Sequence, residues 1–193
     1  MPIFELPPAA AWRHVDAREG FEVVFARPGP AGPAFDGSTS AVEGGEPWSV
    51  GYEIALAPDW STRMARVRSR SARGARELCL QFDGSGSWLI DDAPAPHLAG
   101  CRDVDLESSS LTNAFPVHRL SLEVGEAAQA PAAYVRALDL EVQRLEQSYV
   151  RLPDGAAGER YHYISPQFEF ECELAYDRCG LVIAYPGIAM RVR

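Results

Sequence analysis

Residues 167–176 read QFEFECELAY, and apolar and polar side chains alternate along the whole segment. Successive side chains of a β-strand point to opposite faces of a sheet, so this alternation predicts a strand with one face in a core and the other in water. Glu169, Glu171 and Glu173 would then face solvent. The predicted core-facing side chains are Phe168, Phe170, Cys172, Leu174 and Tyr176.

The same two-residue period recurs through most of the chain from Trp48 onward. It organises the segments YEIAL (52–56), ELCLQF (77–82), WLI (88–90), RYHYI (160–164), GLVIAY (180–185) and IAMRVR (188–193). Gly, Asp and Pro separate these runs, as in DGSGSW (83–88), which fits a hairpin turn that places Trp88 in a core or cavity. Many short strands at regular spacing predict a mainly β chain, a meander that curls toward a barrel.

Two segments depart from this pattern. Residues 27–47, RPGPAGPAFDGSTSAVEGGEP, are rich in Gly, Pro and Ser, which predicts a long surface loop or a mobile flap. Residues 139–149 are ambiguous, with a slight preference for a helix from periodicity alone. One set of apolar residues follows helical spacing: Leu138, Val142, Leu145 and Tyr149. An overlapping set follows strand spacing: Leu138, Leu140 and Val142.

Length and charge limit the possible classes of function. The 193 residues fit a single domain, 1–193, that is large enough to bury a core. The net charge of −9 argues against nucleic acid and anionic membranes as general partners, because both attract a basic face. All 18 basic residues are arginine, whose planar guanidinium suits carboxylate or phosphate groups.

The sequence carries no recognisable targeting or metal-binding pattern. The N-terminal segment lacks a basic and apolar leader, and no window approaches 18 uninterrupted apolar residues. We therefore expect no transmembrane segment, a cytoplasmic location and reduced cysteines. The four cysteines fit no common zinc spacing, and the glycines of residues 83–88 do not form a phosphate-binding motif. We expect no metal and no cofactor.

The segment GCRDVDLESSSLTNAFPVHRL (100–120) holds the strongest candidates for chemistry. In a strand, Asp103 and Asp105 would project from one face about 7 Å apart, with Val104 and Leu106 on the other. Three interpretations remain open. The aspartates form an ion pair with Arg119 in the next predicted strand, contact a polar ligand, or act as acid and base. His118 would lie on the strand face opposite Arg119, as a surface or rim residue, and no nucleophile motif accompanies it.

Two further sets of residues are suggestive. In WSTRMARVRSRSARGAR (60–76), Arg66, Arg68 and Arg70 share a face, which favours a solvated edge strand over a site for phosphate or an acidic partner. Trp60 and Arg63 would form an aromatic and cationic rim at the mouth of this strand. Tyr161 and Tyr163 would give one sheet face an apolar surface with hydroxyl tips. Such a face fits a plain core, and on a concave sheet it would also suit an amphiphile.

An ordered series of motifs covers roughly residues 48–191: WSTR (60–63), DGSGSW (83–88), GCRDVDL (100–106), TNAFPVHRL (112–120), QSY (147–149), YHY (161–163) and DRCGLVIAYPG (177–187). In this series the sequence resembles the putative glycolipid-binding family of bacterial proteins. The resemblance implies a mainly β fold, a single strongly curved antiparallel sheet that forms an incomplete barrel with little helix, similar to lipoprotein-carrier domains. It also implies that residues 134–149 are extended.

The chain departs from the family pattern in two places. Ser109, Ser110 and Leu111 stand where the family usually has Thr-Pro, and His118 with Arg119 stands where it usually has two arginines. Arg119 is therefore the stronger candidate of the two. Carried over by position, the resemblance implies a polar cavity lining of Asp103, Asp105, Asn113, Arg119 and Tyr149. The expected wall or rim residues are Trp60, Arg63, Trp88, Tyr161 and Tyr163.

We accordingly expect a protein without catalytic residues that binds an amphiphilic or glycolipid-like small molecule on the concave face of the sheet. The alternative is an enzyme for a small polar or sugar substrate, with Asp103 or Asp105 as acid or base. A third possibility is an interaction module that binds an acidic partner through the arginines of Arg63–Arg76 or through the loop at residues 27–47. The sequence does not indicate the oligomeric state.

Overall fold

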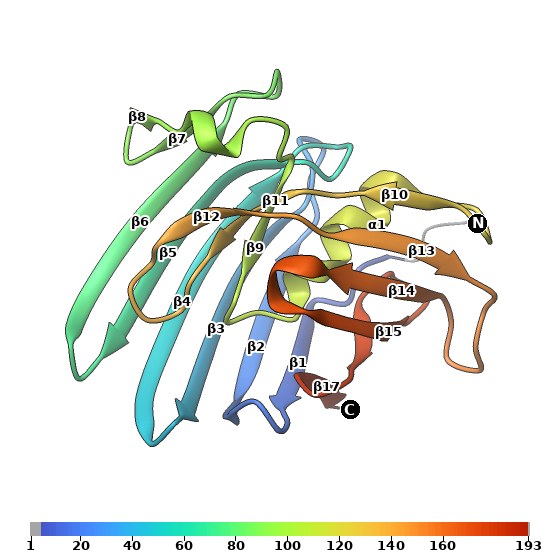
Figure 1. The fold of residues 1–193 in the computed structure, drawn as a ribbon, viewed down its shortest axis with the longest axis horizontal. Helices are drawn as coiled ribbons and strands as arrows, with labels where there is room; N and C mark the ends of the chain where they lie inside the picture. The colour runs from blue at the N-terminus through green and yellow to red at the C-terminus, as the bar shows by residue number, and fades with distance from the viewer. Residues whose placement is uncertain (1–4, 193) are drawn as a thin grey trace.

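The computed structural model describes residues 5–192, and its main feature is an antiparallel sheet of fourteen strands (Figure 1). Neighbours in the sheet are mostly neighbours in the chain, and pairing of the first strand with the last joins the two halves. In spatial order the strands are β10 (Ala127–Gln129), β13 (Ser148–Leu152), β14 (Arg160–Ser165), β15 (Phe170–Tyr176), β16 (Val182–Tyr185), β17 (Ala189–Val192), β1 (Ala9–His14), β2 (Glu19–Arg27), β3 (Ala34–Glu43), β4 (Glu46–Leu56), β5 (Thr62–Ser71), β6 (Gly74–Phe82), β7 (Trp88–Ile90) and β8 (Ala93–Pro94).

A second, three-stranded sheet lies against the large one. Its strands are β9 (Asp103–Leu106), β11 (Ala132–Val135) and β12 (Val142–Leu145), and β9 runs parallel to β11. The helical segments are η1 (Pro96–Leu98), η2 (Leu111–Asn113), α1 (Ala114–Leu120) and η3 (Pro166–Phe168). The large sheet curves around the small sheet and α1 (Figure 1), and its two edge strands, β8 and β10, do not pair with each other to close a barrel. The prediction of a mainly β fold with an incomplete barrel is confirmed.

Two separate cores hold these layers together. The larger core packs the inner side chains of β1 to β7 against the apolar face of the small sheet, including Val104, Leu106 and Val135. The smaller core lies between α1 and the strands β13 to β16 and is rich in tyrosine. The small sheet therefore has one face toward an apolar core and the other toward a region where hydroxyl groups are abundant.

The segment that carries Arg119 is helical, so the prediction of a strand there is wrong. Pro116 lies in the first turn of α1, where backbone N–H groups have no partner within the helix and proline costs no hydrogen bond. The helix ends at Ser121, whose backbone adopts the left-handed conformation with φ of +47°. Helical rather than strand geometry decides where His118 and Arg119 point.

The prediction of a surface loop at residues 27–47 is also wrong, because most of this segment forms β3 and the start of β4. Its small residues have a packing role. A Cβ atom on Gly37 would lie 2.1 Å from Cζ of Tyr52, so glycine leaves the space that the tyrosine ring occupies. Small residues are typical of loops, which is why composition predicted one here. In β3 such a residue instead allows close packing against the neighbouring strand.

Replacing Gly37 with alanine is expected to lower the free energy of unfolding by about 1–3 kcal/mol, the usual cost of overpacking. The buried Tyr52 ring would have to move away from its partners to admit the new methyl group. Urea denaturation monitored by circular dichroism measures this change. Gly51→Ala is the matched control, because a Cβ at Gly51 in β4 would meet no atom within 4 Å. Equal stability of the two variants would contradict the packing argument.

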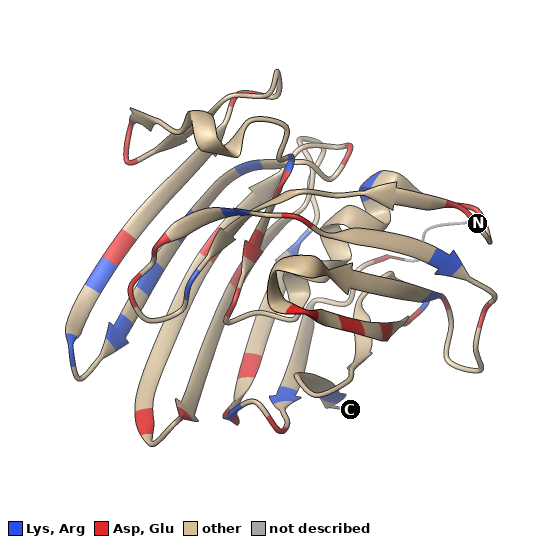
Figure 2. Ribbon diagram, in the orientation of Figure 1, with Lys and Arg blue, Asp and Glu red and all other residues tan. Residues whose placement is uncertain are grey.

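Three smaller expectations are corrected as well. Residues 139–149 contain β12 and the start of β13, so the extended conformation implied by the family resemblance is confirmed and the helix is wrong. Phe168 belongs to η3 and is exposed, so the predicted strand begins only at Phe170. β5 lies between β4 and β6 and is not an edge strand. Acidic residues on its neighbours β4 and β6 form ion pairs with its outward arginines, as Glu53 and Glu77 do with Arg68; Figure 2 shows the charges of both signs on β5 and β6.

Candidate functional site

Asp103 and Asp105 lie on one face of the small sheet. Asp103 pairs with Ala132 and Asp105 with Tyr134 across the parallel strands. Val104 and Leu106 point to the other face, into the larger core. The prediction that the aspartates share a face opposite these apolar residues is confirmed. The aspartate face is directed away from the larger core, so its polar groups need partners from α1 and from strands β13 to β16.

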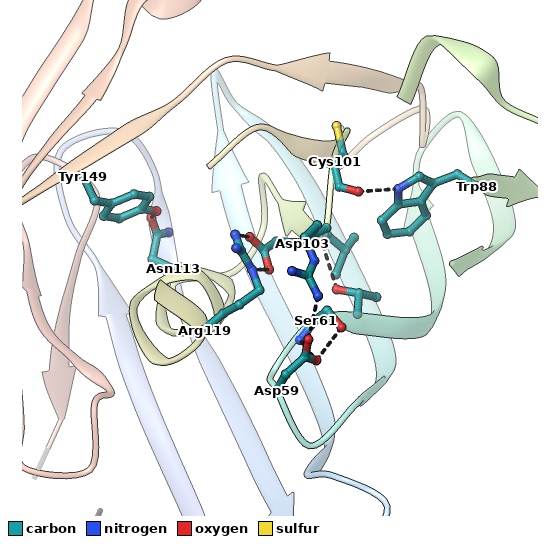
Figure 3. Close-up of polar contacts among 11 residues, drawn as sticks. Asp59, Ser61, Trp88, Cys101, Asp103, Asn113, Arg119 and Tyr149 are labelled. Carbon is teal, nitrogen blue, oxygen red and sulfur yellow. Dashed lines mark hydrogen bonds and ion pairs between the residues drawn. The ribbon is translucent and has the colours of Figure 1, made fainter. Parts of the chain in front are cut away.

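Asp103 forms a bidentate ion pair with Arg119, which reaches it from α1 (Figure 3). Nε of Arg119 donates to Oδ1 at 3.0 Å, and Nη2 donates to Oδ2 at 2.5 Å. Asp103 is only 1% exposed. Burial raises the pKa of its carboxyl, and the hydrogen bonds and charge of Arg119 oppose that rise. The structural ion pair considered from the sequence is therefore present, and it uses both carboxylate oxygens.

Asp105 has a different environment, because within residues 5–192 it forms no ion pair. Oγ1 of Thr112 donates a hydrogen bond to its Oδ1 at 2.8 Å. Burial raises the pKa of Asp105 to about 6, the hydrogen bond from Thr112 lowers it, and the charges of Asp103 and Glu107 add to the rise. A buried carboxyl with one hydrogen bond has acceptor capacity to spare, since an ionised carboxylate offers about four acceptor positions.

Tyrosine rings form the wall near Asp105. The charge of Asp105 contributes, after burial, to the raised pKa of Tyr163, and it also raises the pKa of Tyr185. The rings of Tyr163 and Tyr185 meet edge to face, with centroids 6.1 Å apart. Phe170 packs against both of them. Asp105 is linked to this wall through the helical segment: Thr112 donates to Asp105, the next residue, Asn113, accepts from Tyr149, and the Tyr149 ring lies 5.2 Å from that of Tyr163.

Asn113 connects this wall to the helical segment. The hydroxyl of Tyr149 donates to Oδ1 of Asn113 at 3.1 Å (Figure 3), and the hydroxyl of Tyr176 donates to its backbone oxygen at the same distance. These two tyrosines are fully buried. They fix the position of η2 relative to β13 and β15, so their hydroxyl groups serve the protein's own structure.

Gln147 contributes a buried polar atom that lacks a partner among the described residues. Its Oε1 makes no hydrogen bond, although the residue is only 2% exposed. Its backbone oxygen accepts from the amide of Ala130, so the pairing of β10 with β13 continues to this position. Gln147 precedes Tyr149 by two residues and thus shares its inward face. Buried polar atoms without a partner are rare in folded proteins and often mark a place for water or a ligand.

Aromatic side chains that are at least partly exposed join the small sheet to η3. Tyr134, the neighbour of Asp105 in the small sheet, contacts Phe168 of η3 with ring centroids 5.3 Å apart. Nε2 of Gln167 donates to Oε1 of Gln143 at 3.0 Å, which also joins η3 to the small sheet. η3, which connects β14 to β15, therefore packs against the small sheet.

The other predicted wall residues lie elsewhere. Trp60 stacks on His118, with ring centroids 3.5 Å apart, and Nε2 of His118 contacts the backbone oxygen of Cys179 at 3.0 Å. Burial lowers the pKa of His118 to about 4, so this half-buried histidine is neutral at pH 7 rather than a free surface residue. Arg63 is exposed on β5. Trp88 lies in the larger core, where its Nε1 donates to the backbone oxygen of Cys101 at 3.0 Å.

The remaining predicted site residues come together around the small sheet. Asp103 and Arg119 are paired, Tyr149 and Asn113 are hydrogen-bonded, and the ring of Tyr163 lies 5.2 Å from that of Tyr149. Tyr161 is buried in the same tyrosine-rich core, with its ring 6.4 Å from that of Tyr149. Of the ten predicted residues, these seven occupy one region: Asp103, Asp105, Asn113, Arg119, Tyr149, Tyr161 and Tyr163.

A third buried carboxyl, Glu22 of β2, was not predicted from the sequence. It accepts hydrogen bonds from the hydroxyl of Tyr52 at 2.5 Å, from the hydroxyl of Ser109 and from the backbone N–H of Ser110 at 2.7 Å. Burial raises its pKa, and these hydrogen bonds oppose the rise. Glu22 thus anchors the segment that leads from β9 to η2. Both faces of β2 carry apolar residues, so alternation gave no signal that Glu22 points inward.

Two open hollows lie outside this region, with volumes of about 480 and 460 Å³. The first is lined by Ser49, Gly51, Arg68, Ser69, Arg70, Ala75, Arg76 and Glu77. The second is lined by His14, Val15, Asp16, Ala17, Arg18, Glu19, Val42, Glu43, Gly44 and Gly45. Residues 5–192 contain no cluster of His, Cys, Asp and Glu suited to a metal ion. No helix in this range is long and apolar enough to span a membrane.

The architecture defines the class of protein: an incomplete β-barrel whose hollow side holds a small sheet opposite a tyrosine-rich wall. A profile of the family described as putative glycolipid-binding matches residues 9–191. The chain belongs to this putative glycolipid-binding family.

Solved structures agree with this assignment. A crystal structure of a DUF1089 family protein from Pseudomonas aeruginosa is 32% identical in sequence, with a TM-score of 0.78 over 89% of this chain and 92% of that chain. A beta-barrel-like protein of the domain of unknown function DUF1849 from Brucella abortus is 8% identical, with a TM-score of 0.53 over 95% of this chain and 92% of that chain. The second likeness concerns the fold alone. The comparison with curated proteins gives no significant match.

Proposed function

We propose that this protein binds the sugar-bearing or otherwise polar head of an amphiphile between the aspartate face of the small sheet and the tyrosine-rich wall, without catalysing a reaction. One observation carries the proposal: Asp105 is a buried carboxyl with a single hydrogen bond and no ion pair within residues 5–192. The family description, putative glycolipid-binding, points to the same class of ligand.

The chemistry of the region suits a polyhydroxylated head group. Sugar hydroxyls donate well to an ionised carboxylate, and a hydrogen bond to a charged group contributes about 1.5–3 kcal/mol. The flat apolar face of a sugar ring packs on aromatic rings such as those of Tyr163 and Tyr185. The unpartnered Oε1 of Gln147 offers one more acceptor. An apolar tail would leave past Tyr134 and Phe168, toward the surface.

The region gives less support to catalysis by a pair of carboxyl groups. Asp103 has both oxygens engaged by Arg119, so it is not available as an independent acid or base. Asp105 alone, with a pKa of about 6, could exchange a proton near neutral pH. No second group of matching geometry accompanies it in the described hydrogen-bond network, and binding is therefore the function we propose.

Calorimetric titration with n-octyl β-D-glucoside, kept below its critical micelle concentration, tests the proposal. Asp105→Asn is expected to weaken binding about tenfold, the equivalent of 1.4 kcal/mol, because the charged acceptor is lost while Thr112 keeps an acceptor for its hydroxyl. Glu171→Gln, which removes an exposed carboxyl from the outer face of β15, is the matched control. Unchanged affinity in Asp105→Asn, or no binding by the unaltered protein, would contradict the proposal.

A further inference from the structure

An exposed apolar patch lies on the outer face of the large sheet, where β17, β1 and β2 are neighbours. The outward side chains of β2 include Phe21, Val23 and Phe25, which are 52%, 38% and 57% exposed. On β17, Met190 and Val192 are 41% and 43% exposed. Such side chains are usually scattered singly on a protein surface, whereas a contiguous group marks a contact surface.

The pairing register shows that these side chains are contiguous. Met190, Arg13 and Phe21 form one row across the three strands. Val192, Ala11 and Val23 form the next row. Ala9 and Phe25 complete the patch on the same face. We refer to these eight side chains as the outer patch, and its border on β3 is polar, with Asp36, Ser38 and Ser40 beside the three β2 residues.

The shape and size of the outer patch do not suit a second copy of the chain. Strands lie about 4.8 Å apart and rise about 3.4 Å per residue, so the patch spans roughly 10 Å by 14 Å between backbone positions. This is a few hundred Å² at most, against about 800 Å² per partner in a stable protein interface. The sheet curves around the small sheet, so its outer face is convex and two copies would touch only narrowly (Figure 1).

The charge in the outer patch points the same way. Arg13 is exposed in an end row of the patch, between Met190 and Phe21, and forms no ion pair within residues 5–192. A two-fold dimer sets a patch against itself, so the Arg13 side chains of both copies would be enclosed in one apolar contact without a counter-charge from the patch. At a phospholipid surface the guanidinium can instead reach the lipid phosphates while its aliphatic stem lies among apolar groups.

We propose that the outer patch docks the protein on a phospholipid bilayer surface. Phe21, Phe25 and Met190 enter the boundary between head groups and acyl chains, and Arg13 binds lipid phosphate. The net charge of −9 disfavours a strongly anionic surface, so a zwitterionic bilayer is the suitable partner. This docking is separate from the site at Asp105, which lies on the inner side of the sheet.

Flotation with dioleoylphosphatidylcholine vesicles tests the docking. The unaltered protein is expected to float with the vesicles. The double variant Phe21→Ser/Phe25→Ser should partition at least tenfold less into the vesicle fraction, because it lacks the two aromatic rings whose transfer from water into the bilayer favours binding. Val124→Ser is the control, since Val124 is 57% exposed but lies between α1 and β10 and belongs neither to the outer patch nor to the proposed ligand site. Met190→Ser/Val192→Ser is an independent second double variant. Its flotation tests the docking if Phe21→Ser/Phe25→Ser fails to fold.

Three results would overturn the proposal. They are the absence of flotation by the unaltered protein, flotation of both double variants to the same extent as the unaltered protein, and a concentration-dependent dimer in analytical ultracentrifugation that the double variants abolish. Binding of n-octyl β-D-glucoside by the same variants is expected to stay unchanged. Failure of vesicle docking is thus distinguishable from failure of ligand binding at Asp105.

Discussion

Replacing Arg119 with alanine is expected to lower the free energy of unfolding by about 3–5 kcal/mol, the typical cost of removing one partner of a buried ion pair. Asp103 is 1% exposed and receives two hydrogen bonds from the guanidinium. Without Arg119 its carboxylate would remain buried with no counter-charge, because α1 supplies the only cation described in contact with it. Urea denaturation at pH 7 measures the loss.

The double variant Asp103→Asn/Arg119→Ala is the control for this prediction. It removes both charges, so it should be more stable than Arg119→Ala alone. A loss below about 1 kcal/mol in Arg119→Ala would mean that the pair behaves like a solvent-exposed one. Arg119 would then be free to meet a ligand, contrary to the structural role that the geometry gives it.

Replacing Asp105 with asparagine is expected to stabilise the protein at pH 8 by up to about 3 kcal/mol, since each pKa unit corresponds to 1.36 kcal/mol. The pKa of Asp105 rises from 3.8 to about 6 on folding, so the folded chain prefers the neutral carboxyl. The stability that the proton provides is complete below pH 4. It is lost as pH rises through about 6, and above that pH the buried charge destabilises the fold.

Urea denaturation of both proteins at pH 8 and pH 4 checks this sign. The stabilisation by Asp105→Asn should be largest at pH 8 and should be small at pH 4, where the folded carboxyl is neutral and the unfolded one, with a pKa of 3.8, is about half ionised. A variant that is no more stable than the parent at pH 8 would show that the carboxylate is solvated. Retention of a destabilising charge in a partly satisfied site is typical of residues kept for function.

The sequence-based prediction succeeded where side chains follow local rules. Two-residue alternation identified β4, β6 and β14, since one face of each of these strands is buried and the other is largely open. It failed for β3, because Gly37 and the serines around it have the composition of a loop. The absence of a side chain at Gly37 instead leaves room for the Tyr52 ring of the neighbouring strand. Composition does not reveal this contact.

The candidate site depends on contacts that are remote in sequence. Parallel pairing of β9 with β11 sets Asp105 beside Tyr134, and nothing local to either segment specifies that pairing. Arg119 was linked to Asp103 from charge alone, although its helix was not foreseen. The burial of Glu22 was not predicted, because its partners Tyr52 and Ser109 come from distant parts of the chain.

The most direct test of ligand binding at Asp105 is a ¹³C NMR titration of its side-chain carboxyl, assigned by comparison with Asp105→Asn, with and without n-octyl β-D-glucoside. The free protein should titrate near pH 6. Hydroxyl groups that donate to the carboxylate favour its charged form, so the bound protein should titrate at a lower pH, and affinity should increase as pH rises through 6. A carboxyl whose pKa and chemical shift stay the same in the presence of the probe would contradict the account.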